Sequence, residues 1–463
     1  MSVEAAELIF QQLQNEESGC LSYLIGCGQA GEAIVVDPGR DRVDEYLRLA
    51  AKKGLRITRI LETHTHADHI SGNRDLAALA KAPILLHRAA KAVFDHEPVE
   101  DGQEIKIGNV GLKLLHTPGH TPDSLCLLVT DHTRGNDPWF VLTGDTLFIG
   151  DVGRPDLGGA QAAADLYESL RAVLLPLDDS VEVYPAHGSG SLCGRAMSSK
   201  SASTIGFERR FNPAFRPQGK AEFVEWLMTG LPPKPPSFET IVGKNQGLIP
   251  LIAATPRPCT AREVWQAVSQ GACVLDLRDP ASFGEGHVPG ALNVWIESSQ
   301  FADRVGWFAP AGAPLILVTA GPTDLDRALR GLARVGVDQV VGFLQRGMVE
   351  WKSDGFPVET VPQITVYDLA ERLDERGDLV VIDVREPFEW REGHIAGALH
   401  LPMLEAVKRA AEIPAERPKA VLCAGGLRSS TVISALKRLD VQHWYNVTGG
   451  MTAWLKAGHP VAR

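Results

Sequence analysis

The chain has 463 residues, too many for one hydrophobic core, so we expect it to fold as two to four domains. Its content of 44% hydrophobic and 22% charged residues is typical of an ordinary soluble globular protein. The formal net charge of −11 argues against a nucleic-acid partner.

The first residues and the cysteines indicate the cellular compartment that we expect. The first twenty residues lack a basic start and a long apolar run, so no signal peptide is expected. No segment is apolar over a membrane-spanning length, which predicts no membrane partner. Seven scattered cysteines without a CxxC pair indicate free thiols in a reducing compartment, and we expect a cytoplasmic protein.

Short apolar strands alternate with helices through the first 250 residues. The expected strands cover residues 21–25, 33–36, 57–61, 84–86, 105–107, 112–115, 125–129, 140–142 and 181–184, and the expected helices 42–53, 73–81 and 161–174. Histidines and carboxylates follow several of these strands directly. Ligands gathered from several strand ends are what a site on a layered α/β scaffold needs.

The densest of these clusters holds three imidazoles and one carboxylate within six residues. Neutral imidazole is the commonest protein ligand of metals, so the cluster predicts a metal site. Later strands lead into Pro-Gly-His-Thr, Gly-Asp-Thr and Pro-Ala-His-Gly motifs that add further candidates. The full candidate set is His64, His66, Asp68, His69, His120, Asp145 and His187.

This combination of motifs resembles the metallo-β-lactamase fold, over roughly residues 20–250. The resemblance implies an αββα sandwich with the metal at its edge, and we assign residues 1–250 to this domain. Two activities within the fold remain open. One is a mononuclear non-haem iron oxygenase similar to the persulfide dioxygenases, and the other is a dinuclear zinc thioesterase similar to glyoxalase II, which uses a bridging hydroxide.

In the iron interpretation the resemblance implies one Fe(II) per chain, held by a 2-His-1-carboxylate triad of His64, His120 and Asp145. The remaining four candidates would then orient ligands and water around it: His66, Asp68, His69 and His187. All seven residues occur in both families, so the ligand set alone does not choose between iron and zinc.

Neighbouring segments favour iron. Residues 118–124, 144–148 and 153–156 look like the persulfide-dioxygenase forms of these loops, and Arg154 matches a position that helps build the substrate site in that family. Cys193, six residues after His187, is close enough in sequence to approach the metal pocket and hold sulfur. The family's usual Asp-Tyr pair after the late histidine is missing, so the persulfide carrier is left open between glutathione and coenzyme A types.

Arg195 begins a basic segment, residues 195–220, which contains the single acid Glu208. In an acidic protein such a basic segment is either a candidate binding site for an anionic substrate or a solvated basic face. Three other cysteines receive no role from the sequence: Cys20, Cys27 and Cys126.

Beyond a Pro-rich linker at residues 250–258 the chain repeats itself. Residues 274–279 and 286–291 recur as residues 381–386 and 393–398, and Gly-Met-x-x-Trp occurs near the end of each repeat. Strand–helix alternation predicts two small α/β domains with largely parallel sheets, at residues 251–358 and 359–463.

The second repeat carries a reactive loop. An expected strand at residues 420–422 runs into Cys423, and Gly425 and Gly426 allow the backbone N–H groups to curl inward before a helix at residues 431–438. Such a loop lowers a thiol pKa and favours a nucleophile, while Arg428 can hold an anionic donor. The stretch resembles the rhodanese active-site loop.

The first repeat has Thr319 and Asp324 where the second has Cys423 and Arg428. A hydroxyl cannot readily form a stable persulfide and a carboxylate repels a sulfur anion, so we expect this repeat to be catalytically silent. The whole chain therefore resembles the persulfide dioxygenase–rhodanese fusions.

That resemblance implies oxidation of low-molecular-weight thiol persulfides by O2 to sulfite and thiol, in hydrogen sulfide detoxification. Cys423 would transfer sulfur in thiosulfate formation or use, and we expect a homo-oligomer. A third hypothesis is a sulfur-carrier or persulfide-sensing scaffold whose metal domain only binds.

Overall fold

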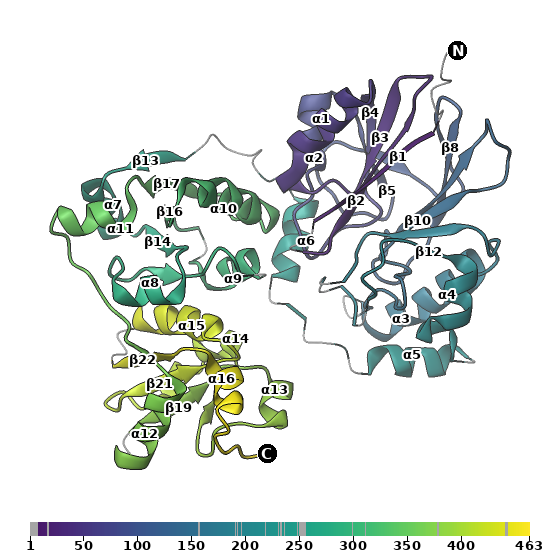
Figure 1. Ribbon diagram of the computed structural model, residues 1–463. Helices are drawn as coiled ribbons and strands as arrows, with labels where there is room; N and C mark the ends of the chain where they lie inside the picture. The colour runs from purple at the N-terminus through teal and green to yellow at the C-terminus, as the bar shows by residue number, and fades with distance from the viewer. Residues whose placement is uncertain are drawn as a thin grey trace, which may run out of the picture. The chain divides into compact units, whose positions relative to one another are not determined.

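Two six-stranded β-sheets form the centre of the N-terminal unit in the computed structural model (Figure 1). The structure describes residues 8–15, 18–155, 158–189, 191, 193–195, 197–217, 219–229, 231, 234–235, 237–247, 249, 256–298, 300–310, 312–376, 379–439 and 443–463. The chain divides into two compact units, one formed mainly by residues up to Ala253 and the other mainly by residues from Ala254 onward.

The first sheet has the strand order β1–β2–β3–β4–β5–β6, antiparallel as far as β3 and parallel beyond it. Its strands are β1 (Leu8–Gln14), β2 (Leu21–Cys27), β3 (Glu32–Val36), β4 (Arg56–Leu61), β5 (Ile84–His87) and β6 (Glu97–Val99).

The second sheet has the order β12–β11–β10–β9–β8–β7, and β10 and β11 form the one parallel pair among its described strands. Its strands are β7 (Glu104–Ile107), β8 (Val110–His116), β9 (Leu125–Asp131), β10 (Phe140–Gly144), β11 (Glu182–Pro185) and β12 (Ser203–Thr204).

Helices cover the outer face of each sheet. They are α1 (Val43–Lys52) and α2 (Asn73–Ala80) on the first sheet, and α3 (Gly159–Glu168), which continues as a π-turn over Ser169–Leu174, and α5 (Lys220–Met228) on the second. Two further helices are α4 (Ile205–Phe211) and α6 (Phe238–Gln246).

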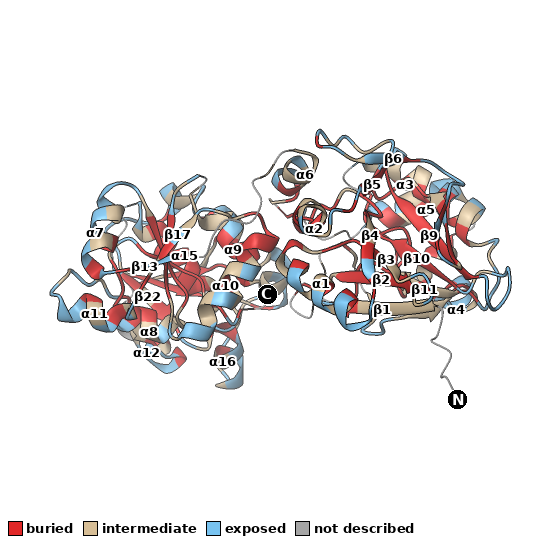
Figure 2. Ribbon diagram, turned by 90° about the horizontal axis from the view of Figure 1, so that it is seen from above, coloured by how far each residue is buried: buried red, intermediate tan, exposed pale blue. Residues whose placement is uncertain are grey.

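Side chains alternate between layers along each strand, as the period of two in a β-strand requires. Tyr23 and Ile25 of β2 point into the core between the two sheets, whereas Leu24 points outward toward α1. A third core joins β9, β10 and β11 to α3 and α5. These three apolar layers confirm the predicted αββα arrangement, and Figure 2 shows the strands of the interior coloured as buried.

The C-terminal unit contains two five-stranded sheets with the same topology, and their described strands pair in parallel. The first sheet has the order β13–β17–β16–β14–β15 and the second β18–β22–β21–β19–β20. This shared order confirms the two α/β repeats predicted from the recurring motifs, while their exact boundaries stay a prediction.

The first repeat contains β13 (Arg257–Cys259), α7 (Ala261–Ser269), β14 (Cys273–Asp276), α8 (Pro280–Glu285), β15 (Leu292–Asn293), α9 (Phe301–Phe308), β16 (Leu315–Val318), α10 (Pro322–Arg334), β17 (Val340–Leu344) and α11 (Gly347–Ser353). The second contains β18 (Gln363–Ile364), α12 (Val366–Arg376), β19 (Val380–Asp383), α13 (Pro387–Glu392), β20 (Leu399–His400), α14 (Met403–Ala406), β21 (Lys419–Leu422), α15 (Leu427–Lys437), β22 (Trp444–Val447) and α16 (Gly450–Lys456).

The repeated Asp-x-Arg and Gly-His motifs are structural. Arg385 forms a bidentate ion pair with Asp383 and donates a hydrogen bond to the carbonyl oxygen of Gly393, at 2.6 and 2.8 Å. Arg278 and Asp276 make the same contacts in the first repeat. These ion pairs fix the turn after the second strand of each repeat.

The two repeats share one hydrophobic core. A single cluster joins β14 and β16 of the first repeat to α15 of the second. Asn293 also accepts a hydrogen bond from Ser430 Oγ at 2.6 Å, and its backbone N–H donates to Ser434 Oγ at 2.9 Å. Helix α15 is consequently buried along Ser429–Leu436, because its own sheet and the first repeat cover it together.

Three differences from the predictions have clear causes. Helix α15 begins at Leu427 rather than residue 431, because Gly426 in the left-handed conformation (φ 94°) starts the helix directly after the loop. Strands β1 and β6 were missed: β1 is only half-buried on most residues and β6 is three residues long. Most of the expected linker at residues 250–258 lies outside the described residues. No helix in the described part of the chain is long and apolar enough to cross a membrane.

Candidate metal centre and sulfur-transfer loop

Three predicted ligands, which follow strands of both sheets, converge at one place. His64 follows β4, His120 follows β8 and Asp145 follows β10. One ligand atom of each lies within 4.8 Å of the others. His120 Nε2 is 3.4 Å and His64 Nε2 is 3.8 Å from Asp145 Oδ2. Adjacent ligands of an octahedral ion with bonds of about 2.1 Å lie about 3 Å apart, so a small inward movement completes such a site.

The same three atoms lack hydrogen-bond partners. His64 Nε2, His120 Nε2 and Asp145 Oδ2 are buried polar atoms without a partner in the described structure. Buried polar atoms are normally satisfied, and three such atoms facing one another are explained by a cation between them. Two imidazoles and one carboxylate form the donor set of non-haem iron(II) sites, so these residues fit the predicted metal.

The tautomers of both imidazoles agree with this assignment. His120 Nδ1 donates to the carbonyl oxygen of Arg154 at 2.8 Å, which leaves a lone pair on Nε2. Thr63 Oγ1 donates to Asp37 at 2.8 Å and can therefore accept from His64 Nδ1 at 3.0 Å. Burial and the nearby His66 hold the pKa of His64 well below its usual value, which keeps this imidazole neutral.

Close packing and a hydrogen bond fix the position of Asp145. A Cβ atom at Gly153 would lie 1.9 Å from the carbonyl oxygen of Asp145 and 3.1 Å from Cβ of His120, so only glycine fits between these two ligands. Asp145 Oδ1 accepts a hydrogen bond from His187 Nδ1 at 2.6 Å. One oxygen of the ligand carboxylate is thus held by the protein and the other faces the site.

The other four candidates are hydrogen-bonded. His187 donates from both ring nitrogens, to Asp145 and, at 2.9 Å, to Asp68 Oδ2. Burial opposes the charge, yet these two carboxylates raise the pKa of His187 well above its usual value. Asp68 Oδ1 lies 3.1 Å from His69 Nδ1. None of Asp68, His69 and His187 has a buried polar atom without a partner.

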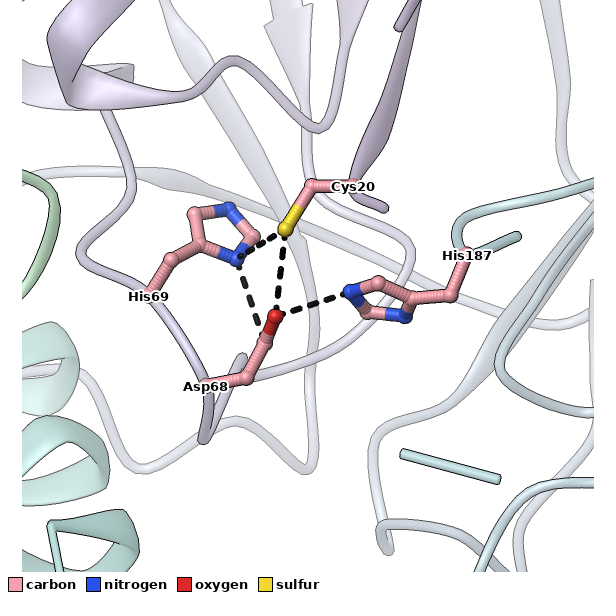
Figure 3. Close-up of side chains that lie close together, drawn as sticks. All are labelled: Cys20, Asp68, His69 and His187. Atoms are coloured by element: carbon pink, nitrogen blue, oxygen red, sulfur yellow. Dashed lines mark hydrogen bonds and ion pairs between the residues drawn. The ribbon is translucent and has the colours of Figure 1, made fainter. Parts of the chain in front are cut away.

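Cys20 joins this second cluster (Figure 3). Its thiol lies 3.2 Å from Asp68 Oδ2 and 3.8 Å from His69 Nδ1, and its backbone forms a bridge with that of His187. Burial opposes ionisation, but His69 and His187 lower the pKa of this thiol from its usual value. Cys20 received no role from the sequence, because pairing between β2 and the segment after β11 is not readable from local sequence.

His66 is one of the four residues on which the two metal hypotheses differ. Its Nε2 contacts Glu62 at 3.1 Å and Asp37 at 3.3 Å, but its Nδ1 is a fourth buried atom without a partner. His66 does not belong to the group formed by His64, His120 and Asp145. It therefore supports the triad here and is the nearest candidate for an additional ligand.

Sequence reasoning gave Glu62 and Asp37 no role at the site. Asp37, in a left-handed conformation at the turn after β3 (φ 52°), holds both Thr63 and His66. Glu62 holds His66 and accepts a hydrogen bond from Ser71. The Asp-Pro-Gly turn and the acid two residues before His64 were the available signals.

The predicted substrate residues lie as follows. Arg154 is buried, with its guanidinium 5.6 Å from the centre of the Phe238 ring, and it reaches the metal ligands through its carbonyl oxygen. Cys193 is buried beside Asp145 and His187, and burial raises the pKa of its thiol. Arg195 pairs with Asp151 at 3.0 Å and stacks over Trp226. Arg209 and Lys220, in the same basic segment, also pair with acids.

The second predicted site lies between β21 and α15. The backbone N–H of Gly426 donates to Cys423 Sγ at 3.1 Å, and Ser429 Oγ is 3.6 Å from the sulfur. Gly425 has nothing within 4 Å of an added Cβ, so the loop is open there. A bidentate ion pair at 2.6 and 2.7 Å joins Arg428 to Glu389 of α13, a partner that sequence reasoning missed.

Comparisons with known proteins match both kinds of domain. Residues 16–188 match the metallo-beta-lactamase superfamily, and residues 260–354 and 365–457 each match the rhodanese-like domain. A solved metallo-beta-lactamase from Staphylococcus aureus is 31% identical, with a TM-score of 0.65, and the match covers 74% of this chain and 99% of that one.

Two curated relatives match the N-terminal unit. Mitochondrial persulfide dioxygenase ETHE1 of Bos taurus is 30% identical over 241 residues, which is 52% of this chain and 88% of that protein. Hydroxyacylglutathione hydrolase of Nitrosococcus oceani is 37% identical over 169 residues, 36% of this chain and 61% of that protein. The chain belongs to the metallo-β-lactamase superfamily, as a fusion of a domain similar to the persulfide dioxygenases with two rhodanese-like domains. This homology supports an enzyme with a sulfur-related role.

Proposed function

We propose that the N-terminal domain is an iron(II) persulfide dioxygenase that oxidises low-molecular-weight thiol persulfides. The observation that carries this proposal is the set of three facing, unpartnered atoms: His64 Nε2, His120 Nε2 and Asp145 Oδ2. The overall reaction is R–S–S⁻ + O2 + H2O → R–SH + SO3²⁻ + H⁺. When bound, iron(II) would supply adjacent open positions for dioxygen and for the terminal persulfide sulfur.

The chain's own residues hold and orient the reaction centre. Thr63 and the carbonyl oxygen of Arg154 fix the rings of His64 and His120, and His187 fixes Asp145. The ligand side chains are at most 2% exposed, which limits water around them. Cys193, buried beside Asp145, is the nearest thiol to the triad carboxylate and is proposed to face the bound sulfur.

Two assays test this domain together. Iron-loaded protein should consume O2 when glutathione persulfide or coenzyme A persulfide is added, with one iron per chain by metal analysis. The better of the two persulfides identifies the thiol carrier. No O2 uptake with either compound, from protein that contains stoichiometric iron, would rule out the dioxygenase.

A zinc thioesterase is the second candidate. Its support is the unpartnered Nδ1 of His66, the second group formed by Cys20, Asp68, His69 and His187, and the 37% identity to a hydroxyacylglutathione hydrolase. It requires two zinc ions per chain and oxygen-independent hydrolysis of S-lactoylglutathione. The same metal analysis, with an anaerobic thioester assay, separates the two candidates.

We propose that Cys423 accepts and donates sulfane sulfur, in thiosulfate formation or use. Its sulfur lies in a loop whose Gly426 N–H already contacts it, at the start of helix α15, where the helix dipole favours an anion. Because the two activities are on one chain, persulfide or sulfite made at one site is present at high local concentration for the other. Such coupling would serve hydrogen sulfide detoxification.

The first rhodanese repeat is proposed to be silent. The carboxylate of Asp324 accepts hydrogen bonds from the N–H groups of Ala320 and Gly321, at 3.2 and 3.1 Å. In the second repeat the N–H group of Gly426, in the equivalent loop, donates to Cys423 Sγ. The first loop thus binds its own carboxylate at the place where an active loop would bind a sulfur anion.

A further inference from the structure

The silent repeat reaches the neighbourhood of the reactive cysteine. Helix α9 belongs to this repeat, and its Trp307 and Phe308 pack against the core cluster that contains Cys423 of the second repeat (Figure 1). The helix is buried along Phe301–Val305, including the charged residues Asp303 and Arg304. Two buried charges on a short helix at a domain boundary call for a role beyond packing, since burial of charge is costly.

Arg304 is the unusual member of this pair. It is 6% exposed, and its Nε is a buried nitrogen without a hydrogen-bond partner in the described structure. It lies within electrostatic range of both Cys423 and Arg428, although it comes from the other repeat. Burial lowers the pKa of Arg304 to about 10, a value at which the guanidinium is still charged at neutral pH.

The positive charge of the sulfur-transfer loop does not balance the negative charge of a thiolate and a bound sulfur anion, so a second cation is expected. Arg428, the arginine of the loop itself, is neutralised by the bidentate ion pair with Glu389. A thiosulfate dianion approaching a thiolate brings three negative charges together. The loop N–H groups and the helix dipole supply only partial charges against them.

We propose that Arg304 of the silent repeat binds the anionic donor or product at Cys423, so that the sulfur-transfer site is built from both repeats. The inference rests on the proposed sulfur-transfer function and extends it by one specificity residue. The anion that Arg304 would bind is an oxyanion of sulfur, either thiosulfate or sulfite. The unpartnered Nε is the donor that such an oxyanion would use.

The transfer step shows where this cation acts. The Cys423 thiolate attacks the outer sulfur of thiosulfate, a new S–S bond forms on Cys423, and the S–S bond of thiosulfate breaks. The electron pair of the broken bond leaves with sulfite: Cys–S⁻ + S–SO3²⁻ → Cys–S–S⁻ + SO3²⁻. Arg304 would hold the SO3 group, whose negative charge grows as it leaves.

Alkylation of the full chain tests the charge near Cys423 without any sulfur transfer. Rates at Cys423 are measured by mass spectrometry with iodoacetate, an anion, and iodoacetamide, a neutral reagent of similar size. We expect Arg304→Gln to lower the iodoacetate-to-iodoacetamide rate ratio roughly tenfold, the size of one charge-assisted contact. Arg304→Lys should keep most of the ratio. Arg262→Gln, which removes an exposed arginine of α7 in the same repeat, should match the wild type.

Steady-state transfer from thiosulfate to cyanide gives the second readout. Arg304→Gln should raise the KM for thiosulfate by roughly tenfold with a smaller change in kcat, because the lost contact binds the donor. An unchanged rate ratio and an unchanged KM in Arg304→Gln would overturn the proposal. If the wild type transfers no sulfur at all, the proposed function fails, and the alkylation ratio still decides whether Arg304 acts on anions at Cys423. For each variant, an iodoacetamide rate equal to that of the wild type shows that the loop is folded.

Discussion

Nδ1 of His187 lies 2.6 Å from Oδ1 of Asp145, so a histidine holds the ligand carboxylate by the oxygen that does not face His64 and His120. Partners of this kind fix the orientation of a ligand and tune its charge, and their loss usually costs 10- to 100-fold in metal affinity. We therefore expect His187→Gln to weaken iron binding by roughly that factor without unfolding the domain. Iron titration against a chelator measures it, with exposed His132→Gln as the control. Equal affinity in both variants would contradict the assignment.

The triad itself is tested by comparing His64 with His66. His64→Ala, His120→Ala and Asp145→Asn should each purify without iron, because each removes a donor from the group of three. His66→Gln should retain stoichiometric iron, since its imidazole is held by Glu62 and Asp37 outside that group. Metal analysis of the four variants gives the answer. Loss of metal from His66→Gln would instead indicate a site of the zinc thioesterase kind.

Gly153 offers a test of packing at the same site. The Cβ of Gly153→Ala would overlap the carbonyl oxygen of Asp145, so two ligands must shift or the loop must deform. We expect a loss of about 1–3 kcal/mol in the free energy of unfolding, together with reduced iron content. Chemical denaturation and metal analysis measure the two effects. Gly219→Ala is the matched control, because an added Cβ there meets nothing within 4 Å.

Cys423→Ser should remove sulfane sulfur loading and leave O2 consumption with an added thiol persulfide near the wild-type rate. The two sites use different residues, so their activities are separable. Cyanolysis of the loaded protein measures bound sulfur, and an oxygen electrode measures the other activity. Cys259→Ser, a buried thiol on β13, serves as the control. If the Cys423→Ser protein still carries persulfide in the amount found on the wild type, a residue other than Cys423 is the sulfur carrier.

The proposed role of Asp324 in silencing the first repeat can be tested by restoring the loop residues. Thr319→Cys alone should stay free of persulfide, because Asp324 still occupies the loop N–H groups of Ala320 and Gly321. Thr319→Cys combined with Asp324→Arg should load sulfur, since it removes the competing carboxylate and supplies a cation. Mass spectrometry of the loop peptide after incubation with thiosulfate detects the added 32 Da (roughly one sulfur atom). Equal loading of the single and double variants would show that Asp324 does not silence the loop.

Local sequence indicated which side chains come together, because each candidate ligand follows an apolar strand and these strand ends meet at one edge of the sandwich. His64, His120 and Asp145 lie after β4, β8 and β10 as the pattern required. Cys20 and Arg304 were missed for the same physical reason. Each reaches its cluster from a distant segment through packing, and no motif or periodicity marks either residue. Glu389 was missed because it lies in α13, between the two repeated motifs, and no sequence pattern pairs it with Arg428.

Helix α15 has no solvent-facing side along Ser429–Leu436, since the first repeat covers what its own sheet does not. Loss of the first repeat would expose this apolar surface of α15. We therefore expect the second repeat to depend on the first for its stability, whatever the chemistry of the first loop.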